Sequence, residues 1–209
     1  MPGIRVMTEL APITALLFLF SATTGGHTME TGGAQAPAAQ FSREDLIALL
    51  DLIYPGRQPE LDDMVYGLAI DPEGYFAAHA DEFEDFDEPY PELYRDVLLY
   101  VMREDDNERA WLFDWKQGHD GINYGLGLLS GGKYAAVLTD ADGEAEWKSA
   151  GEFLAIAARR ILERGDALLE VDRDTDSHTV FIVGAAEAGR VLEYGRRCGM
   201  DVRPFTTVN

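Results

Sequence analysis

Apolar residues recur at helical spacing in three segments before residue 109. The first begins at Ser42, whose side chain can cap a helix, and stops at Tyr54-Pro55-Gly56. The second covers Leu61 to Ala69 and ends at Asp71-Pro72, and the third runs from about Pro91 to Arg103. We therefore predict three helices in this part of the chain.

The pattern changes after residue 109, where short runs of alternating apolar residues indicate strands. The expected strands cover Ala110 to Trp115, Leu168 to Asp172, His178 to Val183 and Val202 to Phe205. Helices are predicted between them, over Ile122 to Leu129, Glu144 to Arg164 and Glu187 to Arg197. Because helices precede, separate and follow the strands, this order predicts an α+β fold: a small mixed β-sheet of about four strands with helices packed on it.

The 209 residues are enough for one well-buried core, and 46% hydrophobic residues are typical of a soluble globular protein. We expect residues 1–40 to be a disordered lead-in and residues 41–209 to form a single α+β domain. Within that domain, residues 41–108 form an acidic helical part and residues 109–209 the part that contains the sheet. The single cysteine, Cys198, excludes an intrachain disulfide, and we expect a packed thiol there.

The first 28 residues have two interpretations. The apolar run from Leu10 to Ala22 is too short to span a bilayer, but its length suits the central region of a signal peptide. Alternatively, Gly25-Gly26 lies two codons before Met29, and two glycine codons can spell a ribosome-binding sequence. We expect a cytoplasmic protein if Met29 is the true start, and an exported one if residues 1–28 are a signal peptide.

The acidic charge is concentrated in the helical part. Residues 60–108 hold 17 Asp or Glu against two arginines, a net charge of −15 in a chain whose total is −21. This field disfavours nucleic acid and anionic membranes, because like charges repel, and it favours a basic protein, a cation or simply solubility. Its most acidic stretch, residues 81–91, also carries aromatic side chains, and exposed aromatics among like charges are typical of a partner-binding segment. The alternative is a solvated surface. The candidate partner-binding residues are Asp81, Glu82, Phe83, Glu84, Asp85 and Phe86.

Asp172, Asp174 and Asp176 place carboxylates at alternate positions, which can converge on a hard divalent cation. An EF-hand loop would require Gly and Glu where this chain has Ser177 and Val183. The alternatives are a β-turn whose side chains bond their own backbone, or a metal site of another kind. Further ligands of such a site would be His178, Asp140, Asp142 or Glu144.

The segment from Gly127 to Tyr134 matches a phosphate-binding loop except at its last position, where Tyr134 replaces the Mg²⁺-binding hydroxyl. Such a loop should also open a long helix, which residues 139–143 interrupt, so a glycine-rich helix exit is the alternative. His119 lies between two glycines, and we interpret it as a surface turn residue. Ser130 lacks the Gly-x-Ser-x-Gly pattern of hydrolases. Without a complete catalytic motif, we lean towards a protein that is not an enzyme.

Two stretches resemble an uncharacterised bacterial family of unknown function. They are the strand that ends in Asp114-Trp115-Lys116 and the strand, turn and strand from Leu169 to His178. The family carries an Asp-Trp-Lys strand and an Asp-Ser-Asp-Ser-Tyr turn, from which Thr175 and His178 depart. The resemblance covers roughly residues 109–183 and implies neither a reaction nor a site.

These observations favour an acidic module that binds a basic protein, as an immunity protein or a toxin inhibitor does. The alternative is a metal-binding protein or metal-dependent enzyme that uses Asp172, Asp174 and Asp176. Apart from a divalent cation, no cofactor is expected. A nucleotide site at Gly127 to Lys133 is a third hypothesis.

Overall fold

The computed structural model describes residues 41–80, 83, 88–104, 108–143, 148–172 and 176–205. The helices are α1 (Arg43–Ile53), α2 (Pro59–Ile70), α3 (Pro72–Ala78), α4 (Leu93–Glu104), α5 (His119–Leu129), α6 (Asp140–Gly143), α7 (Ala150–Leu162) and α8 (Ala185–Arg197). The strands are β1 (Trp111–Phe113), β2 (Asp166–Val171), β3 (His178–Gly184) and β4 (Val202–Pro204).

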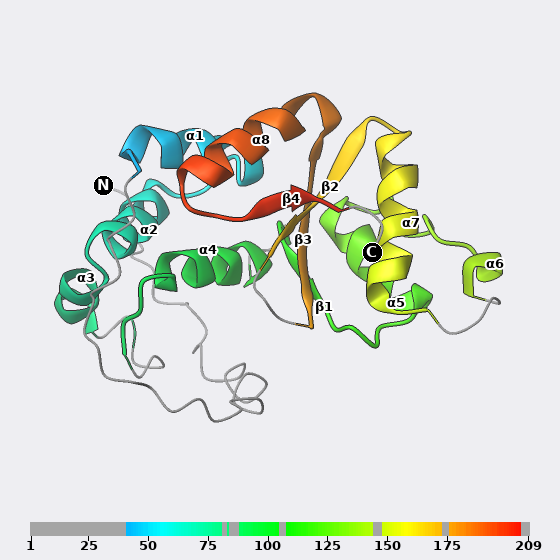
Figure 1. The fold of residues 1–209 in the computed structure, drawn as a ribbon, viewed down its shortest axis with the longest axis horizontal. Coiled ribbons are helices and arrows are strands. Elements are labelled where there is room, and N and C mark those ends of the chain that lie inside the picture. Colours follow the sequence, from blue (N-terminus) through cyan, green and yellow to red (C-terminus); the bar gives the residue numbers. More distant parts are fainter. Residues whose placement is uncertain are drawn as a thin grey trace, which may run out of the picture.

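The sheet lies between two layers of helices, as Figure 1 shows. Helices α1, α2, α3, α4 and α8 lie on one side, and α5, α6 and α7 lie on the other. The α+β class and the four strands are confirmed. We expected a mixed sheet, whereas all three strand pairings are antiparallel.

Side-chain caps explain where two helices begin. Ser42 accepts a hydrogen bond from the backbone nitrogen of Asp45 at 3.1 Å, so α1 starts where its sequence predicted. Ser149 and Glu152 form a capping box at the start of α7. This cap places the first residue of α7 at Ala150, well after the start expected at Glu144.

Helix α3 was not predicted. Asp71 and Pro72 end α2, as expected, but they also begin the next helix. The Asp71 side chain accepts a hydrogen bond from the Gly74 nitrogen at 2.9 Å, and Pro72 occupies the first turn, where its missing N–H costs nothing. The same two residues thus act as a stop signal and as a start signal.

The strand order is β1-β3-β2-β4, with the two longest strands in the centre. Successive side chains along a strand point to opposite faces, so β2 and β3 contribute to both layers. Leu169 and Phe181, which are paired across β2 and β3, belong to the core shared with α1 and α8. Their neighbours Leu168 and Val180 belong to the core shared with α5 and α7.

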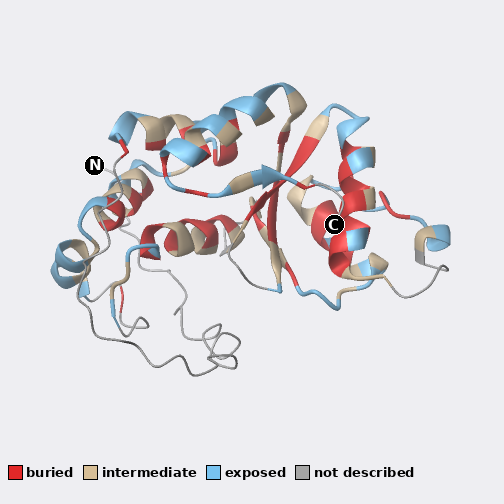
Figure 2. Cartoon of the chain, in the orientation of Figure 1, coloured by how far each residue is buried: buried red, intermediate tan, exposed pale blue. Residues whose placement is uncertain are grey.

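The described residues therefore form two hydrophobic clusters, one on each face of the sheet. The larger one is continuous from α2 and α4 through α1 and α8 to the sheet, so the acidic helices share a core with the strands. Figure 2 shows buried positions on the strands and on the helix sides that face them. Within the described ranges, no helix is both long and apolar enough to cross a membrane.

Cys198 lies buried at the end of α8, which confirms the expected packed thiol. The hydroxyl of Tyr94 donates a hydrogen bond to its carbonyl oxygen at 2.8 Å and so ties α4 to α8. Burial raises the pKa of the Cys198 thiol to about 12, so the reactive thiolate is disfavoured. Gly199 then ends the helix with a φ of 69°, which suits glycine.

Candidate functional site

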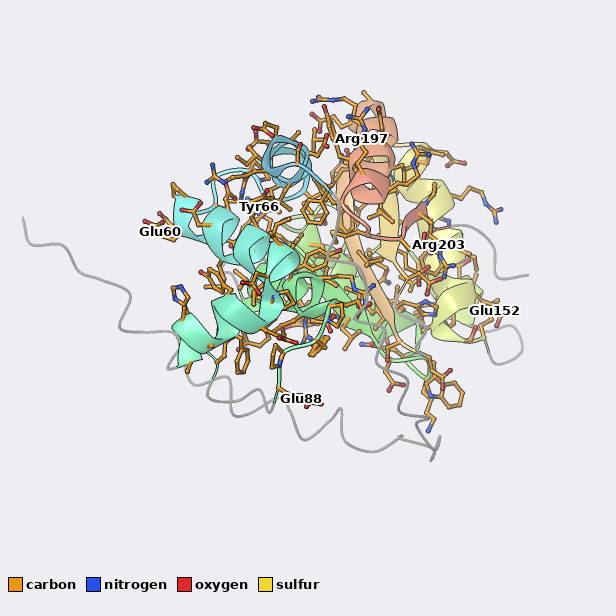
Figure 3. All side chains as sticks on the ribbon, turned by 60° about the vertical axis from the view of Figure 1, so that its left-hand side comes forward. Glu60, Tyr66, Glu88, Glu152, Arg197 and Arg203 are labelled. Atoms are coloured by element: carbon orange, nitrogen blue, oxygen red, sulfur yellow. The ribbon has the colours of Figure 1, made fainter. Side chains whose placement is uncertain are left out.

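Exposed carboxylates mark the side of the molecule formed by α2, α3 and the segment that leads into α4. We call Glu60, Glu73, Glu88 and Glu92 the acidic edge, and all four are exposed. Within the part of the chain that the structure describes, none of them forms an ion pair. Glu60 and Glu88 both project from the margin of the molecule in Figure 3. In sequence, these four residues flank the predicted binding segment on both sides.

Two arginines near the acidic edge are bound to other carboxylates. Arg43 pairs with Asp63 on α2. Arg57 donates from Nη1 to Asp51 at 3.0 Å and from Nη2 to Asp62 at 3.0 Å, and its side chain is only 6% exposed. Neither arginine forms an ion pair with the acidic edge.

The predicted partner-binding segment is described at one position only. Asp81, Glu82, Glu84, Asp85 and Phe86 lie outside the described residues.

Phe83, the position that is described, is 3% exposed. Its ring stacks on Phe76 with centroids 5.3 Å apart and meets the edge of Tyr75 at 6.4 Å. The expectation of an exposed aromatic is wrong for Phe83, because α3, which the sequence pattern did not predict, supplies apolar rings that cover it.

Of the three aspartates of the candidate metal site, the structure describes Asp172 and Asp176. Asp172 follows β2 and is bound by Arg203, whose Nη1 lies 2.6 Å from Oδ2 of the carboxylate. Asp176 is exposed in the turn before β3, and Asp174 lies outside the described residues. Among the residues that the structure describes, no group of three potential ligands has the geometry of a metal site. The cation hypothesis for this turn stays a prediction.

A buried carboxylate beside that turn was missed in the sequence. Glu170 is 6% exposed, and it lies between His178 and Arg203. Its Oε1 is 2.6 Å from Nδ1 of His178, and its Oε2 accepts a hydrogen bond from Nε of Arg203 at 3.0 Å. The three residues come from β2, β3 and β4, so this network ties three strands together. The available signal was a charged residue in the middle of an apolar strand, which is rare unless it is paired.

Asp142, a further candidate metal ligand, is already saturated by protein donors. Arg160 donates to both of its oxygens at 2.6 and 2.9 Å, and the Thr139 nitrogen donates at 2.7 Å. The hydrogen bonds from Arg160 are the main reason why the pKa of the Asp142 carboxyl lies well below its usual value. Glu144 lies outside the described residues, and Asp140 is almost fully exposed, so the structure does not assemble these three into a site.

This ion pair predicts a pH dependence of stability. A depressed folded-state pKa means that ionised Asp142 stabilises the fold above its unfolded pKa of about 3.9, and that this contribution is lost as the pH falls through the folded value. We expect Asp142→Asn to lower the unfolding free energy by about 1.5–3 kcal/mol at pH 7, and the gap to the unmodified protein to shrink below pH 4. Urea titrations at pH 7 and pH 3 measure it. Asp140→Asn, at a side chain 99% exposed, is the matched control, and a gap of equal size at both pH values would contradict the assignment.

The glycine-rich segment after α5 is a helix exit and not a phosphate-binding loop. The Ser130 hydroxyl donates to the Leu126 carbonyl at 2.7 Å and accepts from the Tyr134 nitrogen at 2.9 Å. Gly131 and Gly132 have φ values of 59° and 91°, which turn the chain away from the helix. The segment follows a helix instead of opening one, so its backbone lacks the helix N-terminus that binds phosphate.

His119 is the first residue of α5 and not part of a surface turn. Its ring packs against Phe153 with centroids 6.1 Å apart, and its Nε2 lies 3.2 Å from the Asp120 carboxylate. The turn expectation is wrong because Gly118 is the N-cap of α5, so the helix begins earlier than the apolar pattern indicated.

Comparisons with known proteins give one match. No curated protein and no solved structure matches the chain. Residues 45–205 match a family described as a domain of unknown function (DUF6630). The match spans both layers of helices and all four strands, and it includes the two stretches on which the family resemblance rests. The chain therefore belongs to this family of unknown function, DUF6630.

Proposed function

We propose that the protein is a non-enzymatic module that binds a basic partner protein through its acidic edge, as an immunity protein or inhibitor does. The observation that carries this proposal is the set of four exposed carboxylates without ion pairs among the described residues. The acidic residues between Ala80 and Glu88 lie between members of this edge in sequence. A basic surface is the partner that such a field attracts.

Glu60 and Glu73 lie in the first turns of α2 and α3, and Glu88 and Glu92 lie in the segment just before α4. Leu61, Val65 and Leu68 bury one side of α2, and Leu93 buries the start of α4 in the same cluster. Charged groups on a rigid scaffold lose little freedom on binding, which favours affinity. Their field also accelerates encounter with an oppositely charged protein, and this acceleration depends on salt.

The experiment begins with protein that starts at Met29, used to capture a basic protein from a lysate of the source cell with stepwise salt elution. The association rate of the purified pair is then measured at several salt concentrations. The test variant replaces the whole acidic edge by Gln: Glu60→Gln, Glu73→Gln, Glu88→Gln and Glu92→Gln. A second variant neutralises Asp81, Glu82, Glu84 and Asp85.

We expect each variant to slow association about ten-fold at low salt and to flatten its salt dependence. The matched control removes four exposed carboxylates from the α5–α7 side and so has the same net charge: Asp114→Asn, Asp120→Asn, Asp140→Asn and Glu163→Gln. It should change association much less. Equal slowing by test and control variants would show that only net charge matters, and unchanged kinetics in every variant would overturn the proposal.

A further inference from the structure

A second feature lies on the α5 side of the sheet, and its lining combines two cationic with two acidic side chains. A cavity of about 520 Å³ opens between the segment before β1, the end of α5 and the adjoining ends of β2 and β3. Its size falls within the range of small-molecule sites, about 300–1,000 Å³. Leu128, Leu129 and Ile182 give it an apolar wall, Arg109 and Lys133 supply cationic groups, and Glu108 and Asp166 supply carboxylates.

Arg109 is a donor without an acceptor. Its Nε is buried and has no hydrogen-bond partner. In the ranges that the structure describes, its guanidinium also forms no ion pair, although the chain has 38 acidic residues against 17 basic ones. By contrast, Arg57, Arg160 and Arg203 each bind a carboxylate. Nε of Arg95 is also buried without a hydrogen-bond acceptor among the described residues, but it lies 4.0 Å from the Asp96 carboxylate. Buried polar groups almost always have a partner in protein, water or ligand, so Arg109, which forms no ion pair in those residues, calls for one.

The backbone holds Arg109 in place. The nitrogens of Arg109 and Ala110 both donate to the Met102 carbonyl, at 2.7 and 3.2 Å, which fixes this segment to the last turn of α4. Glu108, which also lines the cavity, has a φ of 42° and is the one non-glycine residue in the described part with a positive φ. Such strained positions persist where the surroundings hold them, and they concentrate at ligand sites.

The positive charge of Lys133, the second cationic group of the cavity, is balanced by Asp166. Lys133 lies 2.6 Å from Oδ2 of Asp166, and the Tyr134 hydroxyl donates to the same oxygen at 2.7 Å. Asp166 raises the pKa of Lys133, so Lys133 is protonated at neutral pH. The carboxylates of Glu108 and Asp166 add negative charge to the cavity, so one anionic charge suits it better than two.

We propose that this cavity binds a small apolar carboxylate, with the carboxylate on Arg109 and the apolar group against Leu128 and Ile182. Arginine fits this role because its planar guanidinium matches a carboxylate in two hydrogen bonds. The adjacent turn lets a ligand approach the backbone closely. Gly131 has a φ of 59° and no side chain, and apart from its chain neighbours no described atom lies within 4 Å of the position that a Cβ would take. This site is independent of the acidic edge.

The test uses benzoate, its neutral counterpart benzamide, and inorganic phosphate as probes on the full chain. The readout is the Nε–Hε nuclear magnetic resonance signal of Arg109, which is identified by its disappearance in Arg109→Gln. We expect benzoate to shift this signal with a dissociation constant on the order of 1 mM, a value typical of so small a ligand. Benzamide and phosphate should bind at least ten-fold more weakly.

Variants separate a binding role from a structural one. Arg109→Gln should weaken benzoate binding at least ten-fold, measured by calorimetry, and leave the melting temperature unchanged, because the guanidinium stabilises no contact in the fold. Asp166→Asn frees Lys133 and should tighten binding about three-fold, whereas Arg190→Gln, an exposed arginine on α8, should change nothing. Equal binding of benzoate and benzamide, or unchanged binding in Arg109→Gln, would overturn the proposal, and tighter binding of phosphate would overturn the ligand class.

Discussion

Replacing Phe181 by alanine is expected to lower the free energy of unfolding by about 3–5 kcal/mol, the largest effect of any single substitution considered for this protein. Phe181 lies in the central strand β3, is 1% exposed and belongs to the larger hydrophobic cluster. Removing its ring forfeits the burial of an aromatic side chain and leaves a cavity that β3, held by hydrogen bonds on both sides, closes only in part. Urea unfolding followed by far-ultraviolet circular dichroism measures the shift.

The same experiment tests whether the chain is one cooperative unit. Trp111 and Trp115, which are on or next to β1, report by fluorescence on the sheet-containing part, whereas circular dichroism reports on all helices. Because both helical layers pack on the same strands, Phe181→Ala should move both transitions by the same amount. Leu162→Ala, at a side chain that is 58% exposed, is the control and should cost less than about 0.5 kcal/mol. A fluorescence transition that stays in place while the dichroism transition moves would show that the acidic helices unfold separately.

The second large effect is expected at Asp62. Arg57 binds both oxygens of this carboxylate, and the two side chains are 6% and 14% exposed. Asp62→Ala leaves a largely buried guanidinium with Asp51 and the Tyr54 carbonyl as its remaining acceptors. We expect a loss of about 2–3 kcal/mol, less than for a fully orphaned buried charge because two acceptors remain. Thermal and urea unfolding at low and high salt measure it.

The neighbouring residue provides a matched control. Asp63 pairs with Arg43, but these side chains are 68% and 46% exposed, so water screens the pair. Asp63→Ala should therefore cost less than about 1 kcal/mol, and that cost should fall as salt is added. Similar losses for the two substitutions would mean that Arg57 is not held by Asp62 in the way the geometry indicates.

Helix positions were predictable where a local signal and the apolar pattern agreed. Ser42 starts α1 and Asp71-Pro72 stops α2, as expected. The start of α7 was predicted too early, because the residues before Ser149 have helical composition and only the capping box marks the true start. Local sequence patterns could not predict that the sheet is antiparallel. The strand directions depend on pairings such as Trp111 with Val180, which are far apart in the chain.

The candidate sites were even less predictable from local sequence patterns than the fold. The acidic charge is visible in composition, but which carboxylates remain free depends on contacts such as that of Arg57 with Asp62. Phe83 was expected at the surface because α3 was not foreseen. Nothing in the sequence marks Arg109. What distinguishes this residue is that its buried Nε has no partner among the described residues, which only the folded structure shows.

The edges of the sheet restrict how this protein recognises anything. Both edge strands have three residues, and β4 ends at Pro204, which has no N–H to donate. A partner that adds its own strand to a sheet needs a row of free backbone groups, and a short edge with proline offers few of them. Strand addition is therefore disfavoured, both for a foreign peptide and for a second copy of this chain. Recognition falls to side chains displayed on helices and loops, where specificity can change by substitution without disturbing the pairing of the strands.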